Sequence, residues 1–448
     1  MHRYCLCFSL LVASTGFFKS CEPDANRYVS QGIALVQTGQ YDQAIPKFDR
    51  ALSIDPRSTL ALSWRGYVWQ CKGRHDNAIA DYTAVLRLQP RSAPSYIGRG
   101  DAWIFKHQYD QAIRDLDAAL EIEPENAAAL AYRGHALVYI GEYDKALADL
   151  DHALRVRPQY AFAYNSRSMA WLRKGDYEKA LSDSNDAIRI QPSRAAAYLA
   201  RGHVWFEKGE YDKTLADCDA ALRLNPKSAH AYEGRAAVWG RRGDFDKALA
   251  EMARALEIDP ANPSAYATRA RIWYEKGDYD KVLADCDHCL KLAPKAAYAH
   301  LGRARAWSKK GRYQEALADC KTALEIAPKD AYAYATLAWL QATCPDARWR
   351  DGPKALENAK RAHDLVLMET WASCEALAAA CAETNDFPTA CQWQSKAVAA
   401  AAADKAATGK EREETRSRLE LYKANKPFRE QPKPAGSPAE GGRGKVPR

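Results

Sequence analysis

Arginine and carboxylate side chains recur together along this chain at intervals of 34 residues. One guanidinium per interval could follow a phosphate backbone, which would make the chain a nucleic-acid-binding protein. However, the two columns are also missing together, at Gln31 with Lys47 and at Leu337 with Asn358. We therefore predict an ion pair within each repeat, for which the planar guanidinium fork is well suited. The two columns are Arg65, Arg99, Arg133, Arg167, Arg201, Arg235, Arg269 and Arg303, and Asp81, Asp115, Asp149, Asp183, Asp217, Glu251, Asp285 and Asp319.

A second candidate for chemistry is the sequence Cys286-Asp287-His288-Cys289, whose spacing suits a zinc or redox site. A zinc ion needs four ligands, and no second pair with suitable spacing lies nearby. A redox pair needs a partly exposed helix N-terminus, whereas Cys286 shares a core column of the repeat with Cys218 and Cys320. We therefore predict buried cysteines and no metal.

The chain offers no grouping of residues that would support catalysis. Its ten histidines are scattered, and Thr408-Gly409-Lys410 lacks the upstream glycine of a phosphate-binding loop. Asp149 and Asp151 stand two apart on a predicted helix, so they face different ways. We expect them to be solvated or paired with arginine. The sequence thus predicts a protein that is not an enzyme and has no cofactor.

Small residues and prolines repeat with the same period and indicate which elements position these side chains. A fixed period of this length means stacked supersecondary units, each here a pair of helices. The small residues let the two helices approach closely, Gly141 marks the turn between them, and the proline ends the second helix. The three columns are Gly32, Gly66, Gly100, Gly134, Ser168, Gly202, Ala236, Ala270 and Ala304; Ala44, Ala78, Ala112, Ala146, Ala180, Thr214, Ala248, Val282 and Ala316; and Pro56, Pro90, Pro124, Pro158, Pro192, Pro226, Pro260, Pro294 and Pro328.

The motif from Tyr132-Arg133-Gly134 through Gly141-Glu142-Tyr143-Asp144 and Ala146 to Ala153 and Pro158 resembles the tetratricopeptide repeat. The resemblance covers about residues 25–404, and the segment around Leu337-Ala338-Trp339-Leu340 resembles the closing part of many bacterial members. It implies an all-α fold, a right-handed superhelical solenoid of about eleven helix-turn-helix repeats with a C-terminal capping helix.

The expected organisation follows from the columns and from changes in composition. Residues 25–330 hold nine regular repeats, and residues 331–404 hold two more with an insertion near 344–353. We expect a capping helix over 405–425, since solenoids need polar ends. Residues 426–448 are rich in proline, glycine and basic residues, which predicts a disordered basic tail. That C-terminal region carries most of the net charge of +8, because residues 405–448 hold 12 Lys or Arg and 6 Asp or Glu.

Residues 1–24 resemble a signal peptide, with His2-Arg3 before an apolar run from Tyr4 to Phe18. This run suits an export signal better than a membrane span, which needs about 20 residues. Cys21 could then carry a lipid and attach the chain to a membrane. We expect export, to a periplasmic or lipid-anchored location. The alternative is a cytoplasmic location, favoured by nine cysteines outside the leader without an obvious disulfide framework.

In the tetratricopeptide family the first helix of each repeat lines the concave face, where partners bind. Carried over position by position, the resemblance implies a groove that is largely apolar and aromatic at first and basic in its last third. This suits an extended or helical peptide with an apolar half and an acidic end. The implied peptide-binding residues are Tyr67, Asp101, Ile104, Phe105, His135, Tyr139, Met169, His203, Phe206, Arg241, Arg271, Tyr274, Arg305 and Lys309.

We therefore expect a non-enzymatic scaffold or adaptor that binds a protein or peptide along its concave face. The chaperone clamp of some family members is not expected, because Tyr67, Asp101 and Ser166 stand where asparagine and lysine are needed. One alternative is binding of nucleic acid or another anionic polymer through the basic C-terminal third. A second alternative is an accessory subunit of an enzyme complex.

Overall fold

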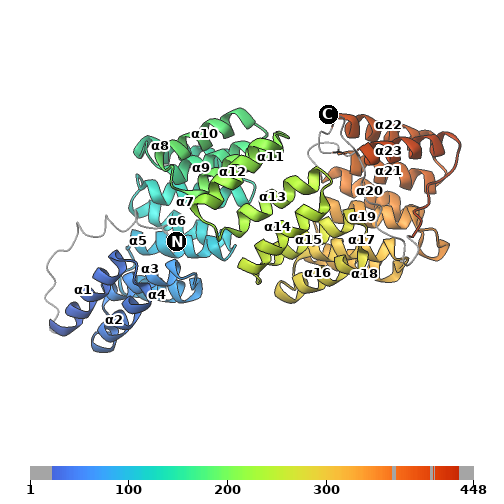
Figure 1. The fold of residues 1–448 in the computed structure, drawn as a ribbon. Coiled ribbons are helices and arrows are strands. Elements are labelled where there is room, and N and C mark those ends of the chain that lie inside the picture. Colours follow the sequence, from blue (N-terminus) through green and yellow to red (C-terminus); the bar gives the residue numbers. More distant parts are fainter. Residues whose placement is uncertain (1–22, 366–369, 404–406, 408, 433–448) are drawn as a thin grey trace. The chain divides into compact units, whose positions relative to one another are not determined.

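The computed structural model describes residues 23–365, 370–403, 407 and 409–432. Within these residues the chain is all α-helical, and the helices follow one another as antiparallel pairs (Figure 1). Eleven such pairs precede a last helix, α23 (Gly409–Lys423). The predicted all-α repeat fold is therefore confirmed. The leader, with Cys21, lies outside the described residues.

The chain divides into two compact units, residues 1–204 and 205–448, and the division falls within α11 (Ala195–Glu207). The first unit contains five complete helix pairs. Their first helices are α1 (Pro23–Gln37), α3 (Thr59–Cys71), α5 (Ala93–Phe105), α7 (Ala127–Tyr139) and α9 (Ala161–Arg173), and their second helices are α2 (Tyr41–Ile54), α4 (His75–Leu88), α6 (Tyr109–Ile122), α8 (Tyr143–Val156) and α10 (Tyr177–Ile190).

The second unit continues the same alternation. After α12 (Tyr211–Leu224) its first helices are α13 (Ala229–Arg241), α15 (Pro263–Lys276), α17 (Ala297–Lys309), α19 (Ala331–Thr343) and α21 (Trp371–Glu383). Its second helices are α14 (Phe245–Ile258), α16 (Tyr279–Leu292), α18 (Tyr313–Ile326), α20 (Gly352–Asp364) and α22 (Phe387–Ala403). A short 3-10 helix, η2 (Ala347–Trp349), lies in the segment between α19 and α20.

The fourth repeat, α7 with α8, illustrates how the sequence defines each pair. Asn126 caps α7 by accepting hydrogen bonds from the N–H groups of Ala128 and Ala129. Gly141 has a φ of 86°, a left-handed conformation that costs glycine little, and so reverses the chain into α8. Where the helices cross, a Cβ on Gly134 would lie 2.7 Å from Cγ of Leu150. The small residue is therefore required for the close approach.

Within each unit the core consists of small clusters, each shared between neighbouring helices. Ala146, Leu150 and Ala153 of α8 are fully buried and form part of one cluster with residues of α5, α6, α7 and α9. Trp171 of α9 is only half-buried, and Lys179 of α10 covers its ring at 4.2 Å from the centroid. This tryptophan therefore contributes a cation–π contact within its repeat as well as apolar packing.

The C-terminal end differs from the prediction of a disordered tail over 426–448. Residues 426–432 are described, form no helix, and contact α19 and α21 through hydrogen bonds and ion pairs. Contacts with α19 and α21 hold this segment in place. The composition of the segment does not indicate such contacts. The prediction is corrected for 426–432, and residues 433–448 lie outside the described part of the chain.

Candidate peptide-binding surface

The arginine column forms the predicted ion pairs inside the repeats. In seven repeats the guanidinium lies 2.6 or 2.7 Å from the carboxylate sixteen residues later, which the prediction named. In the remaining repeat, Arg201 donates to Oδ1 of Asn185 at 2.8 Å. Burial raises the pKa of Asp81 and of Asp183 although their arginines oppose this shift. These arginines therefore join the two helices of a repeat and are engaged in structure.

The same arginines also reach back to the preceding repeat, which the sequence analysis did not predict. Nη1 of Arg133 donates to Oδ1 of Asp117, on the second helix of the repeat before, at 2.7 Å. Arg269 has no such bond among the described residues, because Ala253 occupies the acceptor position. The acceptor positions lie sixteen residues before each arginine and therefore also recur every 34 residues, which is the sequence pattern that could have predicted this bond. The polar residues at these positions that accept the bond are Asp49, Thr83, Asp117, Asp151, Asn185, Asp219 and Asp287.

Three residues expected to line the groove in the first unit are buried in its core. Tyr67 is 7% exposed, Asp101 5% and Ile104 8%. Nε2 of Gln70 donates to Oδ2 of Asp101 at 3.0 Å, while the hydroxyl of Tyr82 donates to Oε1 of Gln70 at 2.6 Å. Neighbouring repeats pack against these positions, so the expectation of a partner-binding surface is corrected for all three.

Two exposed aromatic residues of the first unit contact the preceding repeat. Phe105 stacks on His75 with ring centroids 4.8 Å apart, and Tyr139 stacks on Tyr109 at the same distance. Phe105 is 37% exposed and Tyr139 50% exposed. One face of each ring is therefore covered by the aromatic ring of the preceding repeat, while part of the ring remains accessible.

The remaining predicted residues of the first unit are partly or fully accessible. His135 is half-buried, and its Nδ1 lies 3.1 Å from Oγ of Ser166. Met169 is half-buried and packs against the cluster around α8, whereas His203 is exposed.

In the second unit, three of the predicted residues line a pocket of about 510 Å³. It lies on the face formed by α15, α17 and the start of α19, which we call the first-helix face. Arg271 and Tyr274 of α15 and Arg305 of α17 line it, with Tyr298, Tyr332 and Cys286 as further walls. Beside it, Arg241 lies over the ring of Phe206 at 5.9 Å. Arg271 and Arg305 of the predicted basic third thus line a common cavity.

Arg271 and Arg305 differ from the arginine column in that no carboxylate pairs with them among the described residues. The guanidinium of Arg305 lies 4.1 Å from the ring centroid of Tyr274. Burial, followed by the charges of Arg241 and Arg305, lowers the pKa of Arg271. Burial also raises the pKa of the nearby Glu275, against the effect of Arg305. Burial alone would lower the pKa of Arg305, but Tyr274 and Glu275 raise it. Two guanidinium groups thus line one pocket, where Glu275 offsets part of their charge without an ion pair in the described part of the chain.

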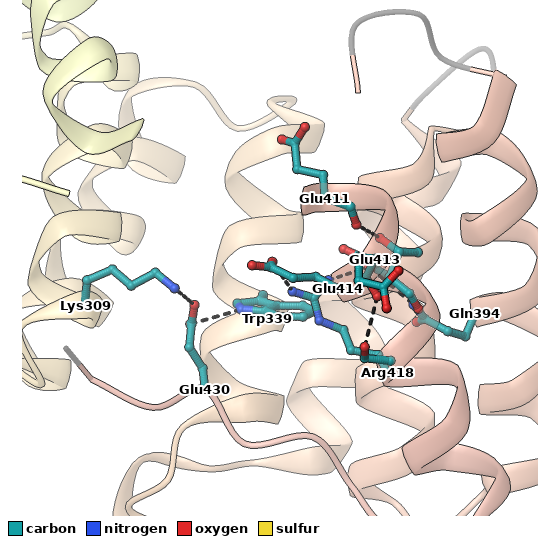
Figure 2. Close-up of polar contacts among 11 residues, drawn as sticks. Lys309, Trp339, Gln394, Glu411, Glu413, Glu414, Arg418 and Glu430 are labelled. Atoms are coloured by element: carbon teal, nitrogen blue, oxygen red, sulfur yellow. Dashed lines mark hydrogen bonds and ion pairs between the residues drawn. The ribbon is translucent and has the colours of Figure 1, made fainter. Parts of the chain in front are cut away.

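Lys309, the last predicted residue, is occupied by the chain's own C-terminal segment. Its Nζ lies 2.5 Å from Oε1 of Glu430, and Nε1 of Trp339 donates to Oε2 of the same carboxylate at 3.1 Å (Figure 2). Burial alone would lower the pKa of Lys309, but Glu430 and Tyr274 outweigh it and the pKa lies above its usual value. Sequence reasoning missed Glu430, since nothing in a tail of this composition indicates a partner 121 residues away.

The structure also bears on the cysteines and on membrane spans. Cys286 and Cys289 are 1% and 0% exposed, so the prediction of buried cysteines is confirmed for this motif. Burial raises the pKa of the Cys286 thiol to about 12. Within the described ranges, no three His, Cys, Asp or Glu side chains are grouped so that they could hold a metal ion. No helix in those ranges has the length and apolar character needed to cross a bilayer.

Comparisons with solved structures find the same architecture. A human IFIT1 dimer with PPP-AAAA aligns with a TM-score of 0.52 and 16% identity, over 86% of this chain and 96% of that one. The Cut9–Hcn1 hetero-tetramer of the APC/C aligns with a TM-score of 0.51 and 14% identity, over 94% and 86%. At these identities the likeness concerns the fold alone. No curated protein matches the chain significantly in sequence.

Models of the tetratricopeptide repeat match residues 29–96, 133–195, 203–273 and 297–330. Together these segments make up more than half of the chain and fall on the helix pairs described above. The sequence columns, the eleven helix pairs and these matches agree, and the chain therefore belongs to the tetratricopeptide repeat family.

Proposed function

We propose that this protein is a non-enzymatic scaffold that binds a protein or peptide partner, with the first-helix face of the second unit as the binding surface. In this proposal the pocket between Arg271 and Arg305 receives an acidic side chain or a terminal carboxylate of the partner. The aromatic walls formed by Tyr274, Tyr298 and Tyr332 pack against the partner's apolar neighbours.

One contrast carries the proposal. Every arginine of the structural column donates to a side chain of its own or the preceding repeat, whereas Arg271 and Arg305 line a pocket without an ion pair in the described residues. Bringing cationic groups close together out of water is unfavourable unless an anion compensates. A preorganised pocket of this kind would bind an acidic group without ordering a loop first.

The experiment is a selection of random displayed peptides on the immobilised full chain, followed by fluorescence anisotropy with one selected peptide. We expect acidic peptides to be enriched, and we expect Arg271→Gln/Arg305→Gln to weaken binding about 10- to 100-fold, since hydrogen bonds to charged groups are the strong ones. The matched control is Arg254→Gln, which removes an arginine that is exposed on α14. Equal affinity of the double variant and the unchanged chain would contradict the proposal.

The rival function is binding of nucleic acid or another anionic polymer through Arg271, Arg305, Lys309 and the basic tail. IFIT1, solved with PPP-AAAA, shares only the fold with this chain. A polymer that neutralises several lysines and arginines loses affinity steeply as salt rises from about 50 to 200 mM. The test is titration of the chain with a single-stranded RNA oligonucleotide over this range of salt. RNA binding that is tighter than binding of the acidic peptide, and whose affinity falls steeply with salt, would favour the rival. A stoichiometric catalytic partner on co-purification would instead indicate an accessory subunit.

A further inference from the structure

The segment that follows α23 lies across the last repeats in the way a bound peptide would. Residues 426–432 form no helix or strand, and the N–H of Glu430 donates to the carbonyl of Thr343 at 2.9 Å. Arg429 adds a bond from Nη1 to the carbonyl of Ala342 at 3.1 Å and an ion pair with Glu383 at 2.6 Å. Backbone and side-chain groups of the segment thus contact the C-terminal end of α19 and α21.

Two side chains of the segment supply most of its specific recognition. The ring of Phe428 packs beside that of Trp339, with centroids 5.7 Å apart, and the guanidinium of Arg418 lies 5.0 Å from both rings. Two residues later, the carboxylate of Glu430 is only 16% exposed between Lys309 and Trp339. Figure 2 shows Glu430 pointing from the segment toward both partners. An aromatic ring and a carboxylate spaced by one residue therefore define the recognised pattern.

The attachment is of a kind that can exchange. The backbone of Glu430 makes one hydrogen bond to the backbone of α19. Within a helix, in contrast, each successive amide donates a hydrogen bond to the carbonyl four residues earlier. Irregular segments with few buried apolar contacts open locally at much lower free energy than packed helices do. The segment also adjoins the arginine pocket, because Glu430 contacts Lys309, which lies one turn of α17 beyond the pocket residue Arg305. Internal segment and candidate partner thus lie on one face.

We propose that Phe428–Glu430 is an internal ligand, and that an external partner replaces it with an extended segment of the same chemistry, an aromatic residue followed two positions later by a carboxylate. This inference rests on the proposed function, since it names the second half of the same binding surface. The incoming segment would place its carboxylate against Lys309 and Trp339 and donate a backbone hydrogen bond to the carbonyl of Thr343. While the internal segment is bound, the apparent affinity for the partner is reduced in proportion to the fraction of molecules in which this surface is open.

The test uses the full chain carrying Phe428→Ala/Glu430→Ala, here called the released-tail variant, and a fluorescent peptide with the sequence of residues 426–432. Anisotropy should give at least about tenfold tighter binding to the variant than to the unchanged chain, because the competing internal segment is gone. A peptide with glutamine at the position of Glu430 should bind about tenfold more weakly. Equal binding to both proteins, or no preference for the carboxylate, would overturn the inference.

Further variants separate this inference from the proposed function. Adding Lys309→Gln to the released-tail variant should abolish binding of the tail peptide. Arg271→Gln/Arg305→Gln should weaken it by no more than about threefold, because the carboxylate of Glu430 bonds to Lys309 and Trp339 and to neither arginine. Conversely, Lys309→Gln as a single substitution should leave the affinity for the acidic peptide that binds the arginine pocket nearly unchanged. If the released-tail variant does not fold, hydrogen exchange of the unchanged chain decides. Exchange at the amide of Glu430 as slow as in the middle of α19 would show a fixed cap and overturn the inference.

Discussion

Arg133 and Asp149 are joined by two parallel hydrogen bonds, from Nε to Oδ2 and from Nη2 to Oδ1, each 2.7 Å long. The remaining Nη1 of Arg133 bonds to Asp117 of the preceding repeat. One side chain on α7 thus connects α8 of its own repeat and α6 of the repeat before. We call these three hydrogen bonds the Arg133 clamp. The stability of a solenoid depends on the interfaces between neighbouring repeats, and the clamp joins two repeats across such an interface.

Removing the clamp should destabilise the first unit. We expect Arg133→Ala to lower the free energy of unfolding by about 1 to 3 kcal/mol, because it leaves Asp149, which is mostly buried, without its partner. Asp117→Ala should cost less, about 0.5 kcal/mol, since the Asp117 side chain is 48% exposed. Urea denaturation followed by circular dichroism measures both. Lys145→Ala, which breaks an exposed ion pair with Glu142, is the control and should change the midpoint little. Equal effects of all three would refute the clamp.

Two helical glycines should respond in opposite directions to the same substitution. A Cβ at Gly134 would meet Cγ of Leu150 at 2.7 Å and the carbonyl oxygen of Ala146 at 3.1 Å, so Gly134→Ala should destabilise by about 1 to 3 kcal/mol. A Cβ at Gly240 meets nothing within 4 Å, so Gly240→Ala should stabilise by about 0.5 to 1 kcal/mol. Thermal unfolding of the two variants compares them directly. A loss of stability in Gly240→Ala would contradict the role assigned to helix crossing.

The ion pairs within repeats could be predicted because both partners lie in columns of fixed spacing. Arg65 and Asp81 stand sixteen residues apart in one unit, and where one is missing the other is missing too. The bond to the preceding repeat was missed because its acceptor varies among aspartate, asparagine and threonine. The burial of Tyr67 and Asp101 was also beyond the sequence. A column places a side chain on a helix face, but the distance to the next helix decides whether that face remains open.

The internal segment was unpredictable for a different physical reason. Residues 426–432 have no periodic pattern, and their composition is that of chains that do not bury enough apolar surface to fold alone. Their order comes from groups far away in the sequence, such as Lys309 and Trp339 for Glu430. The proximity of Arg271 and Arg305, in contrast, was predictable, since they occupy the same first-helix position in neighbouring repeats.

The thiols should react with alkylating reagents in two groups. Cys71 and Cys391 are half-buried, whereas the other described cysteines are buried. We expect iodoacetamide at pH 8 to modify Cys71 and Cys391 in the folded chain and to reach the buried ones only after urea is added, because the thiolate must be accessible to react. Mass spectrometry of tryptic peptides gives the extent at each site. Rapid modification of Cys286 and Cys289 in the folded chain would instead support a reactive motif.

Alkaline pH should destabilise the fold through its buried thiols. Burial raises the pKa of Cys218, Cys286 and Cys320 to about 12 each, from an ordinary value near 9.0. Above pH 9 the unfolded chain therefore loses protons that the folded chain keeps, so stability is complete below that pH and falls as pH rises toward 12. Each such thiol contributes at most about 1.4 kcal/mol per pH unit. Burial also raises the pKa of Tyr109 and Tyr313 from 10.0 to about 12, so these two groups add to the loss of stability only above about pH 10. Urea denaturation between pH 8 and 11 of the unchanged chain and of Cys286→Ala isolates one thiol, and the variant should show the shallower decline. Parallel curves would mean that the Cys286 thiol ionises alike in both states and is not desolvated as described.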